Sequence, residues 1–129
     1  MEPLFLTLAE VIDIHNDQIE RYGGKAGARD LGLLESAISV PQAGFGGKLL
    51  CSSIFEMAAA YAYHISENQP FIDGNKRTAL ASALVFLELN DISIKDPEGK
   101  LYDAIMKLST GKLSKKALGY LLKDLSKPD

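Results

Sequence analysis

The stretch Gln69–Arg77 has the sequence Gln-Pro-Phe-Ile-Asp-Gly-Asn-Lys-Arg, and its last five positions, 73–77, carry a carboxylate, a glycine, an amide and two cations. Asp73 supplies a hard oxygen ligand of the kind that holds Mg²⁺ beside substrate phosphates. Gly74 lets the backbone approach a ligand closely, and Lys76 and Arg77 add positive charge. If a helix begins after the glycine, its free N–H groups and its dipole favour an anion there. The stretch therefore predicts a nucleotide phosphate site, with a plain turn and a solvated first helical turn as the alternative.

Other site chemistries are not supported by the sequence. Gly47-Lys48 is followed by Leu49, so it does not complete a phosphate-binding loop of the Gly-x-x-x-x-Gly-Lys-Ser/Thr type. A calcium loop starting at Asp73 would need Glu at its twelfth position, where Leu84 stands. Two histidines and one cysteine do not make a zinc site, and no Gly-x-Ser-x-Gly elbow is present.

The elements that position this stretch are expected to be helices. Apolar residues recur at helical spacing through most of the chain, and residues suited to helix caps precede several of these runs. Thr7 and Glu10 have the spacing of a capping box, and Gly23-Gly24 ends the run that follows. The expected helices cover about Leu8 to Tyr22, Asp30 to near Pro41, Ser52 to Asn68, Asn75 to Leu89, Asp96-Pro97 to near Gly111, and Ser114 to Leu125.

The helix expected from Asn75 to Leu89 is apolar on nearly every side, which is typical of a central core helix. The chain has 129 residues, of which 47% are hydrophobic and 24% are charged, and this composition suits one globular domain. We therefore expect residues 1–129 to form a single all-α domain, a bundle of about six helices around this central helix.

Charge and composition narrow the classes of partner and compartment. The formal net charge of −3 argues against a nucleic-acid binder. The N-terminus lacks a secretory signal and no apolar stretch is long enough to span a bilayer, so no membrane association is expected. Cys51 is expected to be a small core residue of a reduced cytoplasmic protein. His15 lies on the apolar stripe of the first helix and is expected to be a hydrogen-bonded core histidine.

The segment Pro41–Lys48, Pro-Gln-Ala-Gly-Phe-Gly-Gly-Lys, has the composition of a loop or a hairpin. Its glycines leave the backbone loose, so it is either a plain connector or a mobile flap with an aromatic tip. Composition alone favours the connector. The residues of such a flap are Pro41, Gly44, Phe45, Gly46 and Gly47.

Gln69–Arg77 also resembles the signature of the Fic/Doc superfamily, His-Pro-Phe-x-Asp/Glu-Gly/Ala-Asn-Gly/Lys-Arg. The resemblance extends over roughly residues 4–125 and implies the Fic/Doc fold. Further segments look like the death-on-curing (Doc) branch of this family, namely Gly27–Asp30, Gly32–Ala37, Pro41-Gln42 and Ala58–Tyr61.

The resemblance implies a role for the residues of the signature. Asp73 would hold Mg²⁺, and Phe71 would be a buried anchor of the loop. The glycine-rich segment falls where the family carries a target-docking flap. Within the anion hole, Asn75 would orient the phosphates and Arg77 would neutralise their charge. The anion hole as a whole would consist of Gly74, Asn75, Lys76 and Arg77.

Two positions separate a kinase from an AMP-transferring Fic protein. Nucleotidyl-transferring members usually have Gly where Lys76 stands and Arg where Leu80 stands. In Doc proteins the lysine accompanies an inverted nucleotide and transfer of the terminal phosphate. The resemblance therefore implies a Doc-type toxin that uses ATP and Mg²⁺ to phosphorylate a hydroxyl of a translation factor of the elongation factor Tu class. Because the family's self-silencing motif is absent, control would come from an antitoxin protein in trans.

Gln69 stands where the family places its general-base histidine. An imidazole takes a proton near neutral pH, whereas a carboxamide has no useful basicity, so we expect an assembled but chemically disarmed site. Three explanations for the glutamine at this position remain: an introduced inactivating change, a naturally inactive protein, or a general base supplied by His64 in its place. If His64 is not the base, it is a structural polar residue. The sequence thus leaves open a disarmed phosphotransferase toxin, a non-catalytic nucleotide- or partner-binding relative, and an AMP-transferring protein.

Overall fold

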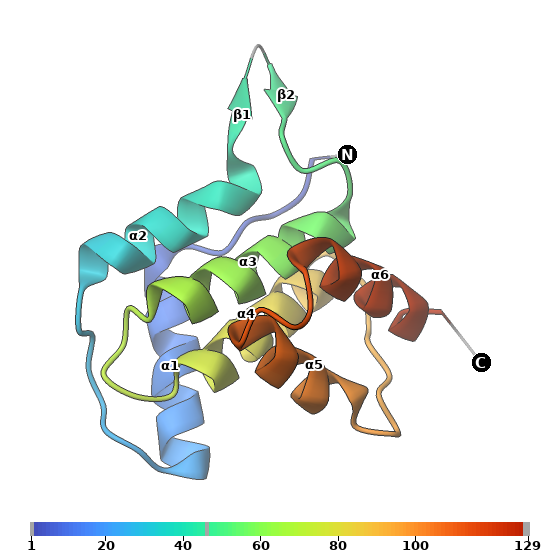
Figure 1. Ribbon diagram of the computed structural model, residues 1–129. Coiled ribbons are helices and arrows are strands. Elements are labelled where there is room, and N and C mark those ends of the chain that lie inside the picture. The colour runs from blue at the N-terminus through green and yellow to red at the C-terminus, as the bar shows by residue number, and fades with distance from the viewer. Residues whose placement is uncertain (1, 46, 128–129) are drawn as a thin grey trace.

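The computed structural model describes residues 2–45 and 47–127, which form one all-α unit (Figure 1). Every helix in these residues is too short or too polar to cross a membrane. A short 3₁₀ turn, η1 (Val40–Gln42), and a hairpin of β1 (Gly44–Phe45) and β2 (Lys48–Leu49) join α2 to α3. The all-α fold expected from the sequence is confirmed. The α-helices are α1 (Leu8–Tyr22), α2 (Leu31–Ser39), α3 (Ile54–Asn68), α4 (Asn75–Leu89), α5 (Lys100–Ser109) and α6 (Lys115–Leu125).

Side-chain caps fix where several helices begin. The Thr7 hydroxyl accepts a hydrogen bond from the Glu10 N–H, and the Glu10 carboxylate accepts one from the Thr7 N–H, which completes the capping box. Asp30, Ser53 and Ser114 each accept a hydrogen bond from the backbone N–H three residues later. These caps lie at or next to the positions that the sequence predicted.

Helix α5 begins later than the sequence indicated. Pro97 lies in a turn, and the helix starts at Lys100, directly after Gly99 in a left-handed conformation with φ of 70°. The Asp96 carboxylate reaches forward and accepts hydrogen bonds from the N–H groups of Lys100 and Leu101, at 2.8 and 2.9 Å. Asp96 therefore caps the helix with its side chain, while Asp96 and Pro97 themselves precede its first turn.

Helix α3 lies at the centre of the bundle. Its residues Ala58–Ala62 are fully buried, and the alanines among them let α2, α4 and α6 pack closely around it. The sequence predicted this place for α4, but Val85 and Leu89 are 39% and 38% exposed, so one side of α4 faces outward. The two helices share the core, where the rings of Tyr61 and Phe86 lie 5.0 Å apart.

The glycine-rich segment before α3 folds as a turn and a hairpin. Gly44 pairs with Leu49, and Phe45 pairs with Lys48. Glycine is required at position 44 because a Cβ there would stand 2.6 Å from the carbonyl oxygen of Lys48. Gly46 and the side chain of Phe45, the predicted aromatic tip, lie outside the described residues. The hairpin stands at the N-terminal end of α3 (Figure 1).

Candidate functional site

The loop between α3 and α4 presents the motif at one end of α3. The helix ends at Asn68, and Gln69 adopts the left-handed conformation, with φ of 47° and ψ of 57°. Its N–H still donates to the carbonyl of Ile65 at 3.1 Å, and the residue is exposed. Because left-handed backbone is uncommon for a residue that carries a Cβ, neighbouring contacts must hold this turn.

Residues 23–30, between α1 and α2, provide these contacts. The carbonyl of Pro70 accepts a hydrogen bond from the Arg29 N–H at 2.7 Å, and the Ile72 N–H donates to the carbonyl of Gly27 at 3.1 Å. The backbone of this segment therefore pairs with the backbone of the motif loop. We call residues 23–30 the supporting segment.

The Arg29 side chain caps the C-terminal end of α3. Its Nε donates to the carbonyl of Gln69 at 2.9 Å, and its Nη2 donates to the carbonyl of Asn68 at 3.0 Å. Carbonyls in the last turn of a helix have no donor within the helix, so this guanidinium stabilises both the helix end and the turn. Sequence reasoning missed this role, for which the match of Gly27–Asp30 with the Doc branch was the available signal.

Beneath the loop, His15 of α1 and Phe71 form a stacked pair. Their ring centroids lie 3.8 Å apart and their planes are 4° from parallel, and both residues are buried. His15 Nε2 lies 2.8 Å from the carbonyl oxygen of Asp73. Because a carbonyl only accepts hydrogen bonds, Nε2 must carry the proton. The expectations of a hydrogen-bonded core histidine and of a buried Phe71 anchor are confirmed.

Asn75 shapes the loop through both ends of its amide. Its Oδ1 accepts a hydrogen bond from the Phe71 N–H at 2.9 Å, and its Nδ2 donates to the Phe71 carbonyl at 3.0 Å. One Nδ2 hydrogen remains for a ligand. The resemblance implied that Asn75 orients phosphates; the observed contacts show that it orients the loop.

Backbone donors hold the Asp73 carboxylate. Oδ2 accepts a hydrogen bond from the Lys25 N–H at 3.2 Å, and Oδ1 accepts one from the Gly74 N–H at 2.9 Å. These two bonds, with the positive charge of Arg77 nearby, keep the pKa of the Asp73 carboxyl below its usual value. The exposed carboxylate is therefore ionised at neutral pH and has lone pairs free for a cation. A Cβ on Gly24 would lie 2.7 Å from Oδ2, so the supporting segment wraps closely around this group.

The first turn of α4 is open to a ligand. Gly74 precedes the helix in a left-handed conformation, with φ of 75°, and offers no side chain to cap it. Among the described residues, no acceptor meets the backbone N–H groups of Asn75, Lys76 and Arg77. Three adjacent donors at the positive end of a helix form an anion-binding arrangement.

Two cations flank this helix terminus. Lys76 is exposed. Arg77 is held in place, because its Nη2 donates to the carbonyl of Gly23 at 3.0 Å and its guanidinium carbon lies 5.6 Å from the ring centre of Tyr22. The other N–H groups of the guanidinium remain for a ligand. The site thus combines one fixed and one exposed positive charge.

An open cavity of about 650 Å³ connects these groups. Its opposite wall comes from Leu80 of α4 and from α5, including Tyr102 and Met106, and sequence reasoning assigned none of these to the site wall. The cavity brings together every residue that the sequence assigned to catalysis or phosphate binding, namely Gln69, Asp73, Gly74, Asn75, Lys76 and Arg77.

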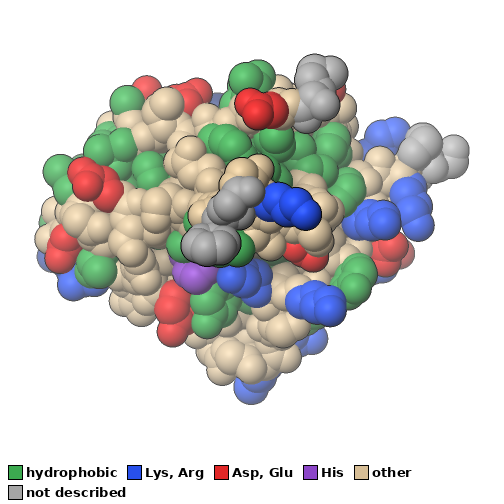
Figure 2. Space-filling model, turned by 90° about the horizontal axis from the view of Figure 1, so that it is seen from above, with side chains coloured by type: hydrophobic (Ala, Val, Ile, Leu, Met, Phe, Trp, Pro, Cys, Tyr) green, Lys and Arg blue, Asp and Glu red, His purple; other side chains and the backbone are tan. Residues whose placement is uncertain are grey.

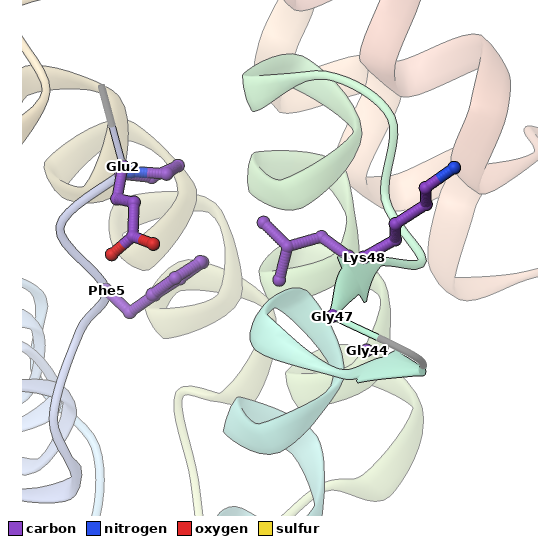
Figure 3. A pocket seen from close by; sticks show the side chains of 7 residues that line it. Glu2, Phe5, Gly44, Gly47 and Lys48 are labelled. Carbon is purple, nitrogen blue, oxygen red and sulfur yellow. The ribbon is translucent and has the colours of Figure 1, made fainter.

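The described residues of the predicted flap do not line this cavity. Gly44, Gly47 and Lys48 line a separate cavity of about 290 Å³ together with Glu2 and Phe5 of the N-terminal segment (Figure 3). In this view Phe5 faces the hairpin across the cavity, whereas Lys48 points away from it. The hairpin precedes α3 and the motif follows it, so a helix about 22 Å long separates the two. The structure therefore places the described hairpin residues away from the phosphate site.

The surface next to the hairpin is partly apolar. Figure 2 looks onto the hairpin and shows hydrophobic side chains at the surface around it. Leu50, directly after β2, is 70% exposed, and Cys51 is half-buried against the core. The expectation of a core position for Cys51 therefore holds only in part.

His64 belongs to a different part of the bundle. Its Nε2 lies 3.1 Å from the Lys115 ammonium nitrogen of α6, and the residue does not line the motif cavity. Because an ammonium only donates, this nitrogen of His64 is unprotonated. Burial, followed by the positive charge of Lys115, lowers the pKa of His64 below its usual value. The structural interpretation of His64 is therefore supported over its use as a base.

Comparison with known proteins agrees with this arrangement. Residues 5–87 match the Fic/DOC family. The chain is 37% identical to "Protein kinase doc" of Escherichia phage P1 over 117 residues, and this aligned region covers 90% of each chain. It is 38% identical to "Toxin Doc" of Mycolicibacterium smegmatis over 73 residues, and this aligned region covers 57% of this chain and 56% of the relative. The chain therefore belongs to the Fic/DOC family.

Proposed function

We propose that this chain is a Doc-type toxin that binds ATP with Mg²⁺ at the start of α4 and is built to transfer the terminal phosphate to a protein hydroxyl. One observation carries the proposal. The open helix terminus, two cations and the Asp73 carboxylate meet in one cavity beside Gln69. The similarity to a protein named as a kinase supports the same type of reaction.

The residues present fit Mg²⁺ held jointly by protein and nucleotide. The described residues contain no group of three or more His, Cys, Asp or Glu side chains that could hold a metal by itself. Asp73 offers one oriented, ionised carboxylate, and Mg²⁺ is commonly bound by one or two carboxylates together with substrate phosphates. A bound Mg²⁺ would neutralise phosphate charge, while the chain keeps this carboxylate in place.

The proposed transfer consists of one bond formed, one bond broken and one proton transferred. The target hydroxyl oxygen forms a bond to the γ-phosphorus, the bond from that phosphorus to the bridging oxygen of ADP breaks, and the hydroxyl proton passes to an acceptor. The N–H groups of the first turn of α4 and the Arg77 guanidinium are suited to stabilise charge on the phosphate oxygens. Gln69 can accept a hydrogen bond from the hydroxyl but cannot take its proton. Loss of a general base typically slows such a reaction by about 10²–10⁴.

Two positions favour phosphate transfer over AMP transfer. Lys76 lines the cavity where nucleotidyl-transferring relatives usually have glycine. Leu80 also lines the cavity and packs against the core, where those relatives usually have a second arginine. An apolar side chain cannot neutralise the charge of a transferred nucleotidyl phosphate. We therefore place AMP transfer second.

The proposed target and regulator rest on the resemblance to the Doc branch of the family. A hydroxyl of a translation factor of the elongation factor Tu class is the proposed acceptor, and an antitoxin protein acting in trans is the proposed regulator. Similarity to a protein named as a Doc toxin supports the antitoxin. The alternative is a non-catalytic relative that binds nucleotide or a partner. Both proposals are consistent with Gln69, because this residue cannot act as the general base.

Titration calorimetry with ATP and Mg²⁺ tests the binding half of the proposal. Arg77→Ala should weaken binding by about 1.5–3 kcal/mol, because it removes a charge-assisted contact to phosphate. Arg21→Ala is the matched control, because Arg21 is an exposed arginine of α1 that pairs with Asp17 and does not line the cavity. Equal ATP affinity of the unchanged chain and the Arg77 variant would contradict the assignment.

A further inference from the structure

Helix α5 carries an exposed stripe that the proposed phosphate chemistry does not use. Tyr102, Met106 and Ser109 are spaced four and three residues apart, so they share one face of the helix. Tyr102 is 70% exposed and Met106 is 38% exposed, whereas Leu101 and Leu108 of the same helix are buried in the core. An aromatic ring and a thioether are therefore held at the surface by a helix whose other side is anchored.

This stripe faces the phosphate site. All three of its residues line the cavity that also contains Asp73 and Arg77. Helix α5 packs on α4 and runs back along it toward the motif, so its Ser109 end lies nearer the start of α4 (Figure 1). Tyr102 lies about 10 Å further along the helix. A ligand held by its anionic end at α4 would extend along the stripe.

The chemistry of the cavity changes along its length. At the α4 end it offers free N–H groups and two cations, which suit phosphate. In the middle, the Ser109 hydroxyl donates to the Met106 carbonyl at 2.8 Å, so its oxygen is left to accept a hydrogen bond, as from a sugar hydroxyl. At the far end, Tyr102 and Met106 offer an aromatic face and a polarisable sulfur, both of which suit a flat aromatic ring.

We infer that Tyr102 and Met106 form the nucleobase subsite of this cavity. The inference rests on the proposed function, because the phosphate site fixes the direction in which the nucleoside extends. The concentration of donors and positive charge at one end argues for a ligand with localised negative charge, and thus for a nucleotide over an apolar partner helix.

Affinities for ATP and for inorganic tripolyphosphate, both measured by calorimetry with Mg²⁺, test this subsite. The unchanged chain should bind ATP about tenfold or more tightly than tripolyphosphate, since stacking adds to phosphate binding. Tyr102→Ala should weaken ATP binding about tenfold and leave tripolyphosphate binding unchanged. Tyr102→Phe should bind ATP like the unchanged chain, because it keeps the ring. Tyr120→Ala on α6, which is similarly exposed at 61% and lies outside the cavity, should change neither affinity.

The possible failures differ in what they overturn. If tripolyphosphate and ATP bind equally well, or if Tyr102→Ala leaves ATP affinity unchanged, the phosphate site stands and the nucleobase subsite is wrong. If neither ligand binds to the unchanged chain, the proposed phosphate site fails, and this inference fails with it.

Discussion

The imidazole of His15 lies flat against the ring of Phe71, with centroids 3.8 Å apart, and its Nε2 donates to the carbonyl of Asp73 at 2.8 Å. One buried side chain of α1 thus contacts two residues of the motif. A Cβ on Gly74 would lie 3.7 Å from the same nitrogen. His15 therefore supports the loop from below, while the supporting segment, residues 23–30, holds it from outside.

Substitutions at His15 should separate stacking from hydrogen bonding. His15→Phe keeps a flat ring and loses the donor, so it should lower the free energy of unfolding by about 1 kcal/mol. His15→Ala also removes the stacked ring and leaves a cavity, so the loss should be about 3 kcal/mol. Urea unfolding measures both, with the exposed α1 substitution Asn16→Ala as control. Equal stability of the two His15 variants would contradict the role given to the stacked ring, and a His15→Phe variant as stable as the unchanged chain would contradict the role given to the hydrogen bond.

Arg29 should act as a positioning residue for Gln69. Arg29→Met removes the hydrogen bonds to the carbonyls of Asn68 and Gln69, and should destabilise the fold by about 1 kcal/mol because the side chain is exposed. In a Gln69→His background it should also lower kcat with little change in the KM for ATP, since the turn that carries the base is loosened.

Arg21→Met in the same background is the control for Arg29. It removes an exposed guanidinium from α1 and should leave kcat unchanged. If Arg29→Met lowers stability but kcat at saturating ATP stays the same, Arg29 is a structural cap and does not position the base.

His64 should make stability depend on pH. Its pKa in the folded chain lies below the usual 6.5, first through burial and then through Lys115. The unfolded chain therefore binds this proton more readily, so the contribution is complete above about pH 6.5 and is lost as the pH falls toward the lowered pKa. Unfolding free energies at about pH 7.5 and 5.5 should differ less for His64→Gln than for the unchanged chain.

NMR titration of the His64 ring gives an independent check. Lys115→Met removes the second cause of the lowered pKa, so the pKa of His64 should move upward toward 6.5. A pKa that stays in place in this variant would show that burial alone sets it.

Local signals in the sequence explain most of the fold. The Thr7–Glu10 capping box and the caps at Asp30 and Ser114 act within three residues, so the sequence displays them directly. The start of α5 was misplaced because the Asp96 carboxylate reaches four residues forward past Pro97. The central place of α3 was missed because it depends on how closely helices pack around alanines, which hydrophobic spacing does not measure.

The candidate site could be predicted where its residues are contiguous. Asp73 and Arg77 meet in one cavity because the same turn carries them. The contacts of Arg29 with Gln69 and the wall formed by Tyr102 join residues far apart in the sequence, and no local pattern indicates such pairs. The position of the hairpin depends on the length and direction of α3, which residue types do not reveal.

The central claim is that this chain has an assembled phosphate-transfer site without its proton acceptor. The most direct test incubates the unchanged chain, Gln69→His and Gln69→His with Arg77→Ala with γ-labelled ATP, Mg²⁺ and purified elongation factor Tu. Gln69→His should label the factor about 10²–10⁴ times faster than the unchanged chain, and the added Arg77→Ala should remove most of that gain. No transfer by Gln69→His, in the factor or in a whole cell extract, would make the chain a binding relative. Equal transfer by the unchanged chain would place the base elsewhere, with Glu67, which also lines the cavity, as the first residue to replace.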